Sequence, residues 1–475
     1  MTGQKTPVLT GEQVVKATGG VLLNGELVKR FHGITTDTRQ TVEGNLFIAL
    51  RGENFNGHDF LGTAVTGGAA GLVIENNERD KLPRAGLNDV NVIGVNDTLR
   101  ALGDMAHFWR GQFKIPVLAI TGSTGKTTTK EMTAAICGLV KNVIKTEGNF
   151  NNLIGLPLTL LRMNKTHEVA VLELGTNRPG EIGRLTRVAA PTVGLITNIG
   201  PAHLEGLKSI DCVREEKGDL FKYLPEGGVA VINLDDRNAK ILGDAWKGEK
   251  VTFGFQSAAD VRAQNIKKLG IDGTRFDLMI GTAAENVVLS QAGEHQISNA
   301  LAAAAAARAL GLDPSVICRG LSSFIMPAGR MEIHRLRGGR FLINDAYNAN
   351  PMSVREAVKT LDDLKGGHAG IVILGDMLEL GEQAEALHEE IGSFIANHHP
   401  EALFLKGDFA RHTAAGAYKS GLSESQVFFL KAPQDILDYL KAQPKEGAWI
   451  LVKGSRKMKM DEIVQKISET FGLAN

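Results

Sequence analysis

The sequence predicts an α/β fold divided into three domains. Its 475 residues are enough for about three hydrophobic cores. From Val117 onward, short and nearly continuous apolar runs alternate with stretches of helical spacing, a pattern typical of strands buried on both faces of a mainly parallel sheet. The alternation restarts after Met326-Pro327-Ala328-Gly329. We therefore expect a small mixed α/β domain at 1–112, a central domain with a mainly parallel sheet at 113–326, and a doubly wound, Rossmann-like domain at 327–475.

The expected elements follow this division. In the first domain, strand-like residues 45–50 and 71–75 lie among turn residues, and a helix-like stretch at 98–113 leads to Pro116, a plausible end of the linker. The central domain has a β-rich stretch at 251–290, an alanine-rich helix around 300–307, and apolar strands at 117–120, 169–173, 193–197 and 229–233. The third domain has strands, each followed by a helix, at 341–344, 370–374, 403–405, 427–430 and 449–452.

Composition excludes several classes of function. Basic and acidic residues balance at 53 each, so no overall field would recruit nucleic acid or an anionic membrane. Aromatic residues make up only 5%, which disfavours stacking on bases. Cys137, Cys212 and Cys318 form no metal or disulfide motif, and residues 1–15 contain no apolar signal core. We expect a cytoplasmic protein that neither binds nucleic acid nor inserts into a membrane.

The most informative motif is a glycine-rich turn between a predicted strand and a predicted helix, Gly122-Ser123-Thr124-Gly125-Lys126-Thr127. Such a turn gathers backbone N–H groups around a phosphate, Lys126 can reach the terminal phosphates, and the Thr127 hydroxyl can hold Mg²⁺. The motif is shortened, because Ile120 stands where the usual pattern has a glycine. An ordinary glycine-rich turn is the alternative. The context favours a nucleoside triphosphate site.

Polar residues follow the next strands of the central domain. Glu173 ends one strand and can serve as a magnesium ligand beside the phosphate loop, although a strand-end glutamate is often simply solvated. His203 follows the next strand, where a structural histidine is the alternative. Lys217 is expected near the start of the following helix, where its simplest interpretation is a charge on an exposed face.

Further polar clusters could recognise a substrate. Residues 149–152 place three amides in four positions, which suits recognition of a sugar or peptide but is also common in turns. Arg330 lies just past Gly329, from where it could reach a phosphate when domains close. The strand at 341–344 then runs into the polar stretch 344–353, which is more polar than folding alone requires.

Taken together, these motifs resemble those of the Mur ligase family. The shortened loop preceded by Thr121, then Glu173, residues 198–203, Lys217, Arg330 and Asp345 occur in the family's order and at similar spacing. Thr36-Asp37-Thr38-Arg39, residues 44–52 and Gly57-His58 resemble the family's uridine-nucleotide-binding domain. Within the family, residues 149–157, 345–351, 374–377 and 453–456 are similar to the member that adds D-alanyl-D-alanine, whereas the sibling that adds the third amino acid carries a short Asp-Asn-Pro signature.

The resemblance implies an ATP-dependent amide ligase with a P-loop ATPase-like central domain. It implies that ATP activates the carboxylate of a UDP-N-acetylmuramoyl-tripeptide as an acyl phosphate, which the amine of D-alanyl-D-alanine then attacks. Two Mg²⁺ ions are implied, held by Thr127, Glu173, His203 and Lys217. An ammonium beside two divalent cations is unfavourable, and in the family the matching lysine is carbamylated by carbon dioxide, which makes Lys217 an anionic ligand.

The resemblance also assigns roles by residue. Catalytic roles fall on Lys126, Glu173, His203, Lys217, Arg330 and Asp345. ATP contacts fall on Thr121, Gly122, Ser123, Thr124, Gly125, Lys126, Thr127, Thr128, Asn299, Arg330 and Asp345. Substrate contacts fall on Thr36, Asp37, Arg39, Asn149, Asn151, Asn152, Asn348, Asn350 and Ser353. We expect a monomer.

One position departs from the family pattern. The family has His-Asn-x-x-Asn before the alanine-rich helix, and here Gln296 replaces the first asparagine while Asn299 is retained.

Two other functions are the alternatives. A nucleotide-driven switch is disfavoured by the shortened loop, and a folylpolyglutamate-synthase-like ligase is disfavoured by the uridine-nucleotide motifs in the first domain. The motifs leave open whether the tripeptide ends in lysine or diaminopimelate.

Overall fold

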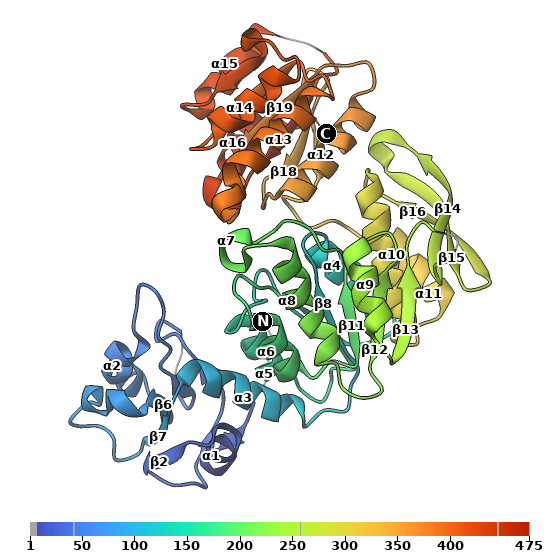
Figure 1. Ribbon diagram of the computed structural model, residues 1–475. Helices are drawn as coiled ribbons and strands as arrows, with labels where there is room; N and C mark the ends of the chain where they lie inside the picture. The colour runs from blue at the N-terminus through green and yellow to red at the C-terminus, as the bar shows by residue number, and fades with distance from the viewer. Residues whose placement is uncertain (1–6, 41–42, 257, 444–445, 475) are drawn as a thin grey trace.

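The computed structural model describes residues 7–40, 43–256, 258–443 and 446–474 (Figure 1). Three α/β regions follow one another along the chain, coloured blue, green to yellow, and orange to red. This confirms the predicted fold class of several domains with mostly parallel sheets. Within the described ranges, no helix is both long and apolar enough to cross a membrane.

The first region is a mixed sheet with strand order β2-β7-β6-β5-β4. Strands β4 to β7 pair in parallel, and β2 is antiparallel to β7. Its elements are β1 Leu9–Thr10, α1 Gly11–Thr18, β2 Val21–Asn24, β3 Arg30–Phe31, β4 Ile34–Thr35, β5 Leu46–Ile48, the 3₁₀ helix η1 Gly57–Phe60, α2 Leu61–Thr66, β6 Gly71–Glu75, η2 Asn76–Lys81, β7 Asn91–Val95 and α3 Thr98–Arg110.

The central region is built on a sheet of strand order β16-β15-β14-β13-β12-β11-β8-β10-β9. The pairs from β9 to β14 are parallel, and β15 and β16 extend the sheet as antiparallel strands. Its elements are β8 Val117–Thr121, α4 Lys126–Gly138, β9 Val143–Lys145, α5 Gly155–Leu161, β10 Val169–Glu173, α6 Glu181–Ala189, β11 Val193–Ile196, α7 Leu204–Leu207, α8 Ile210–Lys222, β12 Val229–Asn233, α9 Arg237–Ala245, β13 Glu249–Phe253, β14 Val261–Lys268, η3 Gly270–Asp272, β15 Thr274–Ile280, β16 Ala283–Leu289, α10 Glu294–Ala309 and α11 Pro314–Ser322.

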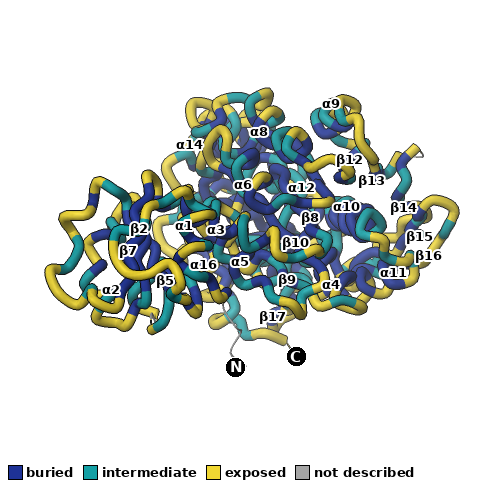
Figure 2. Tube along the Cα trace, turned by 90° about the horizontal axis from the view of Figure 1, so that it is seen from below, coloured by how far each residue is buried: buried dark blue, intermediate teal, exposed yellow. Residues whose placement is uncertain are grey.

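The alanine-rich helix α10 is largely buried, and its trace is mostly dark blue in Figure 2. Ala302 to Ala307 are each 1% exposed or less, and α10 packs against α4 and the strands β12, β13 and β14. Methyl side chains let a helix lie close to its neighbours on every side. The prediction of a packed helix at 300–307 is therefore confirmed, with longer bounds.

The third region is a doubly wound sheet of strand order β17-β18-β22-β19-β20-β21. Its pairs are parallel except for β17, which is antiparallel to β18. The first strand of this sheet was predicted at 341–344, and β17 was not predicted because its mostly half-buried residues lack a continuous apolar run. Its elements are β17 Glu332–Leu336, β18 Arg340–Asp345, α12 Pro351–Lys365, β19 Gly370–Gly375, η4 Gly381–Gln383, α13 Ala384–Ala396, β20 Ala402–Lys406, α14 Ala410–Lys419, η5 Glu424–Gln426, β21 Val427–Phe429, α15 Pro433–Ala442, β22 Trp449–Lys453, η6 Arg456–Met458 and α16 Met460–Phe471.

The first two regions are joined through helix α3, which packs on α5 and α6. Helix α3 ends at Arg110, whose buried guanidinium donates to backbone carbonyls of the linker and of the end of α6. Nε donates to the carbonyl oxygen of Ala189 (3.2 Å) and Nη1 to that of Phe113 (2.6 Å). Nη2 donates to the carbonyls of Ile115 and Ala190, each at 3.3 Å. Arg110 thus ties the linker to the end of α6.

We predict that Arg110→Ala destabilises the protein by about 3 kcal/mol, because several carbonyls lose their charged donor at once. Urea denaturation followed by tryptophan fluorescence measures the change. Arg100→Ala on the same helix is the matched control, since the Arg100–Asp104 pair is solvent-exposed, with 3.6 Å between Nε and Oδ2. An exposed pair contributes at most about 1 kcal/mol. Equal shifts for both variants would contradict the role given to Arg110.

Candidate active site

The phosphate loop lies between β8 and α4, and its two glycines are required by close packing. Gly122 has φ 152°, and a Cβ there would lie 1.9 Å from Thr197 Oγ1. Gly125 has φ 77°, and a Cβ there would lie 2.2 Å from Asn299 Oδ1. A side chain at either position would collide with a neighbouring strand end or helix. Helix α4 begins directly at Lys126, so its free N–H groups face the loop.

The segment after β11 holds the loop in shape. The backbone N–H of Ser123 donates to the Asn198 carbonyl (2.9 Å), and that of Thr124 donates to Asn198 Oδ1 (2.9 Å). Thr197 Oγ1 donates to the Thr124 carbonyl (2.6 Å). These bonds set the loop before any ligand arrives. They also give residues 197–198 a role that the sequence analysis did not assign.

Cationic side chains converge on this loop. The Lys126 amine donates to the Gly122 carbonyl (2.7 Å), and burial lowers its pKa below the usual value. Arg330, from the segment that leads into the third region, donates from Nη2 to Thr127 Oγ1 (3.1 Å). Its guanidinium carbon lies 4.0 Å from the centre of the Tyr347 ring. Tyr347 thus supports Arg330 by a cation–π contact, which the sequence analysis did not foresee.

Glu173 is a buried carboxylate beside the loop, only 3% exposed, so the alternative of a solvated strand end is excluded. Its Oε2 accepts from Thr127 Oγ1 (2.8 Å), and its Oε1 accepts from Asn151 Nδ2 (2.9 Å). A hydroxyl and a carboxylate side by side at a phosphate loop are the hard oxygen ligands that Mg²⁺ prefers. The donor set at Thr127 and Glu173 therefore fits a magnesium ion.

His203 and Lys217 lie near the loop without forming a ready metal site. His203 precedes α7, and its Nδ1 is 2.7 Å from Glu379 Oε2 of the third region. Lys217 lies in the middle of α8 and is 1% exposed, so the predictions of a helix start and of a surface charge are both wrong. Burial, together with Lys126, lowers the pKa of Lys217 well below its usual value. Among the described residues no cluster of three or more His, Cys, Asp or Glu could hold a metal ion.

Several side chains of the polar stretch at the end of β18 form hydrogen bonds within the protein. Asp345 accepts from the buried Lys453 ammonium and from the N–H of Met331 (3.1 Å). Asn350 and Ser353 form the capping box of α12, and Asn350 Nδ2 also donates to the Ser123 carbonyl (3.3 Å). The Asn348 side chain is exposed and makes no hydrogen bond within the described ranges. The amide of Asn348 is therefore free for a ligand.

The Asn149 side chain is likewise exposed and makes no hydrogen bond among the described residues, whereas other amides of the cleft are engaged. Asn152 Oδ1 accepts from the N–H groups of Ile154 (3.1 Å) and Gly155 (2.9 Å) at the start of α5. Gln296 Oε1 accepts from Asn299 Nδ2 (3.3 Å). The glutamine that replaces the family's first asparagine therefore orients the asparagine that is retained. The effect of Gln296 is thus to tie Asn299 in place beside Gly125.

One cleft of about 1260 Å³ gathers most of the predicted residues from the central and third regions. Its lining includes Ser123, Thr124, Gly125, Lys126, Thr127, Thr128, Asn149, Asn151, Asn152, Glu173, His203, Asn299, Arg330, Asp345, Asn348, Asn350 and Ser353. Thr121, Gly122 and Lys217 are not part of its surface. Thr121 instead donates from Oγ1 to the Leu174 carbonyl (3.0 Å).

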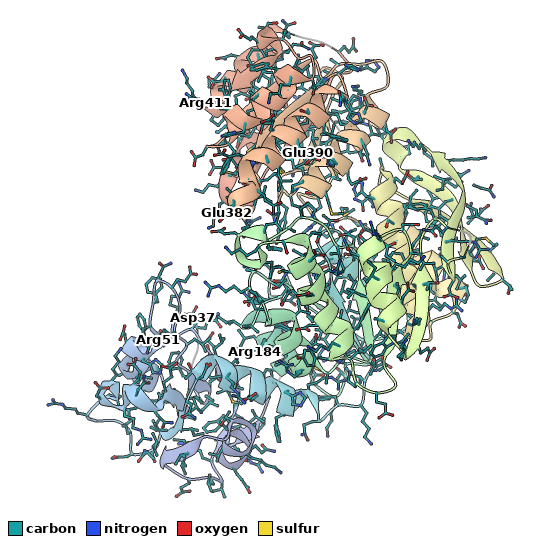
Figure 3. All side chains as sticks on the ribbon, in the orientation of Figure 1. Asp37, Arg51, Arg184, Glu382, Glu390 and Arg411 are labelled. Carbon is teal, nitrogen blue, oxygen red and sulfur yellow. The ribbon has the colours of Figure 1, made fainter. Side chains whose placement is uncertain are left out.

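The predicted uridine-nucleotide residues lie apart from this cleft, on the first region. Figure 3 shows Asp37 on the first region and Glu382 at the lower edge of the third region. Arg39 and Asp37 pair with each other at 2.8 Å, and this contact lowers the pKa of Asp37 to about 2. Thr36 lies beside them on the chain and is not in the cleft lining.

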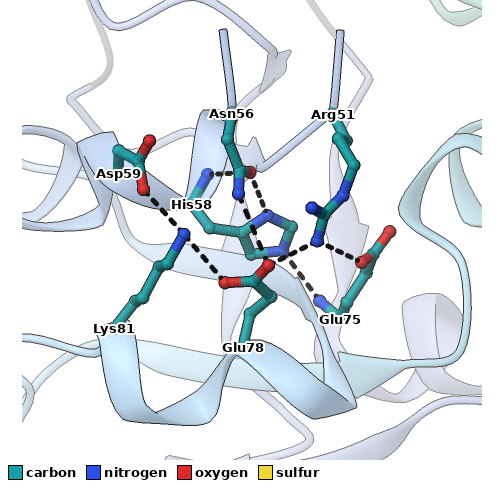
Figure 4. A network of polar contacts seen from close by, with 7 residues as sticks. All are labelled: Arg51, Asn56, His58, Asp59, Glu75, Glu78 and Lys81. Atoms are coloured by element: carbon teal, nitrogen blue, oxygen red, sulfur yellow. Dashed lines mark hydrogen bonds and ion pairs between the residues drawn. The ribbon is translucent and has the colours of Figure 1, made fainter.

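A polar network also orders the loop after β5 in the first region (Figure 4). The Glu78 carboxylate accepts from Arg51, and His58 Nε2 accepts from the N–H of Glu75 (2.9 Å). His58 Nδ1 lies 2.8 Å from Asn56 Oδ1. The arginine and histidine of the predicted nucleotide-binding motif therefore hold the loop itself.

Sequence reasoning missed several residues of the cleft, notably Glu379, Lys453 and Arg456. Lys453 and Arg456 belong to a segment that the resemblance singled out without assigning roles. Glu379 carried no signal, because its place beside His203 depends on how the third region lies against α7. Such contacts between distant segments have no periodicity in sequence.

Comparison with known proteins matches the chain along most of its length. Residues 30–110 match the family model described as "Mur ligase family, catalytic domain", residues 120–307 the "Mur ligase middle domain", and residues 329–456 the "Mur ligase, glutamate ligase domain". The chain is 36% identical to the UDP-N-acetylmuramoyl-tripeptide–D-alanyl-D-alanine ligase of Bacillus subtilis over 463 residues, which cover 97% of this chain and 98% of the relative.

Solved structures give the same result. MurF from Acinetobacter baumannii superposes with a TM-score of 0.89 at 30% identity, covering 98% of this chain and 100% of that one. MurF from Thermotoga maritima in complex with ADP superposes with a TM-score of 0.81 at 26% identity, covering 92% and 97%. The phosphate loop, the cleft and these likenesses lead to one conclusion: the chain belongs to the Mur ligase family.

Proposed function

We propose that this protein uses ATP to join D-alanyl-D-alanine to UDP-N-acetylmuramoyl-tripeptide, a step in the synthesis of the peptidoglycan precursor. The main support for this proposal is the similarity, over nearly the full length of the chain, to UDP-N-acetylmuramoyl-tripeptide–D-alanyl-D-alanine ligases. The cleft supports it, because a phosphate loop and a separate polar wall from the third region face the same space. The relatives disfavour both rivals, the nucleotide switch and the folylpolyglutamate-synthase-like ligase.

The proposed reaction has two steps, each balanced within the cleft. A carboxylate oxygen of the tripeptide attacks the γ-phosphorus of ATP, ADP leaves, and an acyl phosphate forms. The neutral amine of D-alanyl-D-alanine then attacks the acyl carbon, and the tetrahedral intermediate expels phosphate, which takes up the proton lost by the nitrogen. Lys126, the N-terminus of α4 and Arg330 would stabilise the charge on the transferred phosphoryl group.

We propose that Mg²⁺ binds at Thr127 and Glu173, and a second Mg²⁺ at His203 and a carbamylated Lys217. When bound, the ions would neutralise phosphate charge. The amine of Lys217 is buried, and its lowered pKa favours the neutral form that reacts with carbon dioxide. A carbamate would place an anion near Lys126, where protonation of the free amine would place a second cation.

The domain roles are proposed along the same lines. Residues 1–112 would bind the uridine nucleotide through Thr36, Asp37 and Arg39, residues 113–326 would bind ATP, and residues 327–475 would close on ATP and bind the incoming dipeptide. The family-model matches at 30–110, 120–307 and 329–456 support this division. We also propose that the protein is a cytoplasmic monomer.

We predict that Lys126→Ala loses at least a hundredfold in rate, because a charge-assisted contact to the transferred phosphoryl group is worth about 3 kcal/mol. Phosphate release in the presence of both substrates measures the rate, and circular dichroism checks the fold. Lys114→Ala, an exposed lysine outside the cleft, is the control and should keep full activity. A Lys126→Ala variant with most of its activity would exclude the assigned site.

We predict that Lys217→Ala is nearly inactive and that short carboxylic acids such as formate or acetate partly restore it, because the missing group is an anion. Lys126→Ala should show no such rescue, since it loses a cation. A carbamate signal from ¹³C-labelled bicarbonate should be present in the wild type and absent in Lys217→Ala. Absence of both the signal and the rescue would show that Lys217 is an unmodified buried lysine.

We predict that D-alanine alone is a much poorer acceptor than D-alanyl-D-alanine. The polar wall from 344 to 353 is larger than a single small amine needs, and Asn348 offers a free amide there. Steady-state kinetics with each amine give the ratio of kcat/KM. Asn348→Ala should raise the KM for the dipeptide and leave that for ATP unchanged. Comparable kcat/KM values for the two amines would assign the chain to another acceptor.

A further inference from the structure

The third region touches the central region at a second point besides the phosphate loop. This point is the contact of the loop after β19 with the start of α7, which lies directly beneath the C-terminal domain in Figure 1. Glu379 Oε2 lies 2.7 Å from His203 Nδ1. The N–H of Glu205 donates to the Glu379 carbonyl (3.0 Å), and Gln383 Nε2 donates to the Lys208 carbonyl (3.3 Å). Side-chain and backbone bonds thus join the same two segments.

Both residues of this pair have left-handed backbones. His203 has φ 56° and Glu379 has φ 64°. This region disfavours residues other than glycine, and strained residues persist where the surrounding structure holds them for a purpose. The loop that carries Glu379 is held firmly, since the N–H of Leu378 donates to Ser455 Oγ (2.8 Å) and that of Met377 to His388 Nε2 (3.0 Å). The carboxylate is therefore presented by a rigid support.

The contact determines which nitrogen of His203 is available. An ionised carboxylate can only accept, so the proton of a neutral imidazole lies on Nδ1, which leaves a lone pair on Nε2. Nε2 has no hydrogen bond within the described part of the chain. Both His203 and Glu379 line the cleft. A histidine that ligates a metal commonly donates its other N–H to a carboxylate in this way.

We propose that Glu379 is a positioning residue that holds His203 with Nε2 free for the second magnesium ion, and that it acts only while the C-terminal domain rests on α7. The inference rests on the metal role proposed for His203. Domain closure would then complete the metal site as well as bring Arg330 to Thr127. A carboxylate supplied from another domain makes metal affinity depend on closure.

The test counts Mn²⁺ bound to the full-length protein with a non-hydrolysable ATP analogue, by electron paramagnetic resonance. Glu379→Ala should weaken the second Mn²⁺ by tenfold to a hundredfold. Glu379→Gln should keep most of the affinity, because its amide oxygen still accepts from Nδ1. Glu382→Ala is the matched control, an exposed glutamate three positions further along (Figure 3), and should bind both ions as the wild type does.

Nitrogen NMR of ¹⁵N-histidine-labelled protein gives a second readout that does not depend on metal. The His203 signals, identified by their loss in His203→Gln, should report the Nδ1-protonated form in the wild type and a mixture of tautomers in Glu379→Ala. Unchanged tautomers and unchanged Mn²⁺ binding in Glu379→Ala would overturn the inference. Equal loss of Mn²⁺ in Glu379→Gln and Glu379→Ala would also overturn it, since Glu379 would then be a direct ligand.

The same assay separates this inference from the role on which it depends. If His203→Ala keeps the second Mn²⁺, the metal role of His203 fails and the inference fails with it. If His203→Ala loses the second Mn²⁺ while Glu379→Ala keeps it, the metal role stands and only the inference fails.

Discussion

The parallel pairing of β8 with β10 on one side and β11 on the other determines where chemistry can occur in this protein. Glu173 lies opposite Ile120, and Ile196 lies opposite Thr121. All three strands therefore leave the sheet at one edge, and the phosphate loop meets Glu173 and the segment that ends at His203 there. A slip of one residue in β10 would turn the Glu173 side chain to the other face and separate it from Thr127.

The central sheet supplies only part of the cleft, and the third domain supplies the rest through contacts at separate points. Arg330 reaches Thr127, Asn350 reaches Ser123, and Glu379 reaches His203. All three partners lie at the carboxyl edge of the central sheet or just beyond it. The geometry around the transferred phosphoryl group thus depends on the position of a whole domain. For an acyl phosphate that water would hydrolyse, a site enclosed by two domains has an evident advantage.

Sequence reasoning succeeded where a local pattern determines the structure. The strands at 169–173 and 229–233 were predicted to the residue, because buried parallel strands are continuous apolar runs between turns. It failed at β17, whose half-buried residues lack that pattern, and at Lys217, since nothing local shows that a lysine in a charged helix faces inward. Glu379 could not have been found, because its role depends on the approach of two segments 176 residues apart.

The cations of the cleft repel one another, and a bound anion would relieve that repulsion. Lys217 is buried and Lys126 is half-buried, and the charge of Lys126 adds to the effect of burial in lowering the pKa of Lys217. Arg330 is a further cation, and its charge adds to the effect of burial in lowering the pKa of Lys126. Repulsion among these cations opposes the contact of Arg330 with Thr127 that the structure shows. The phosphates of ATP would reverse that repulsion, so the electrostatic energy that holds the nucleotide also draws the C-terminal domain onto it.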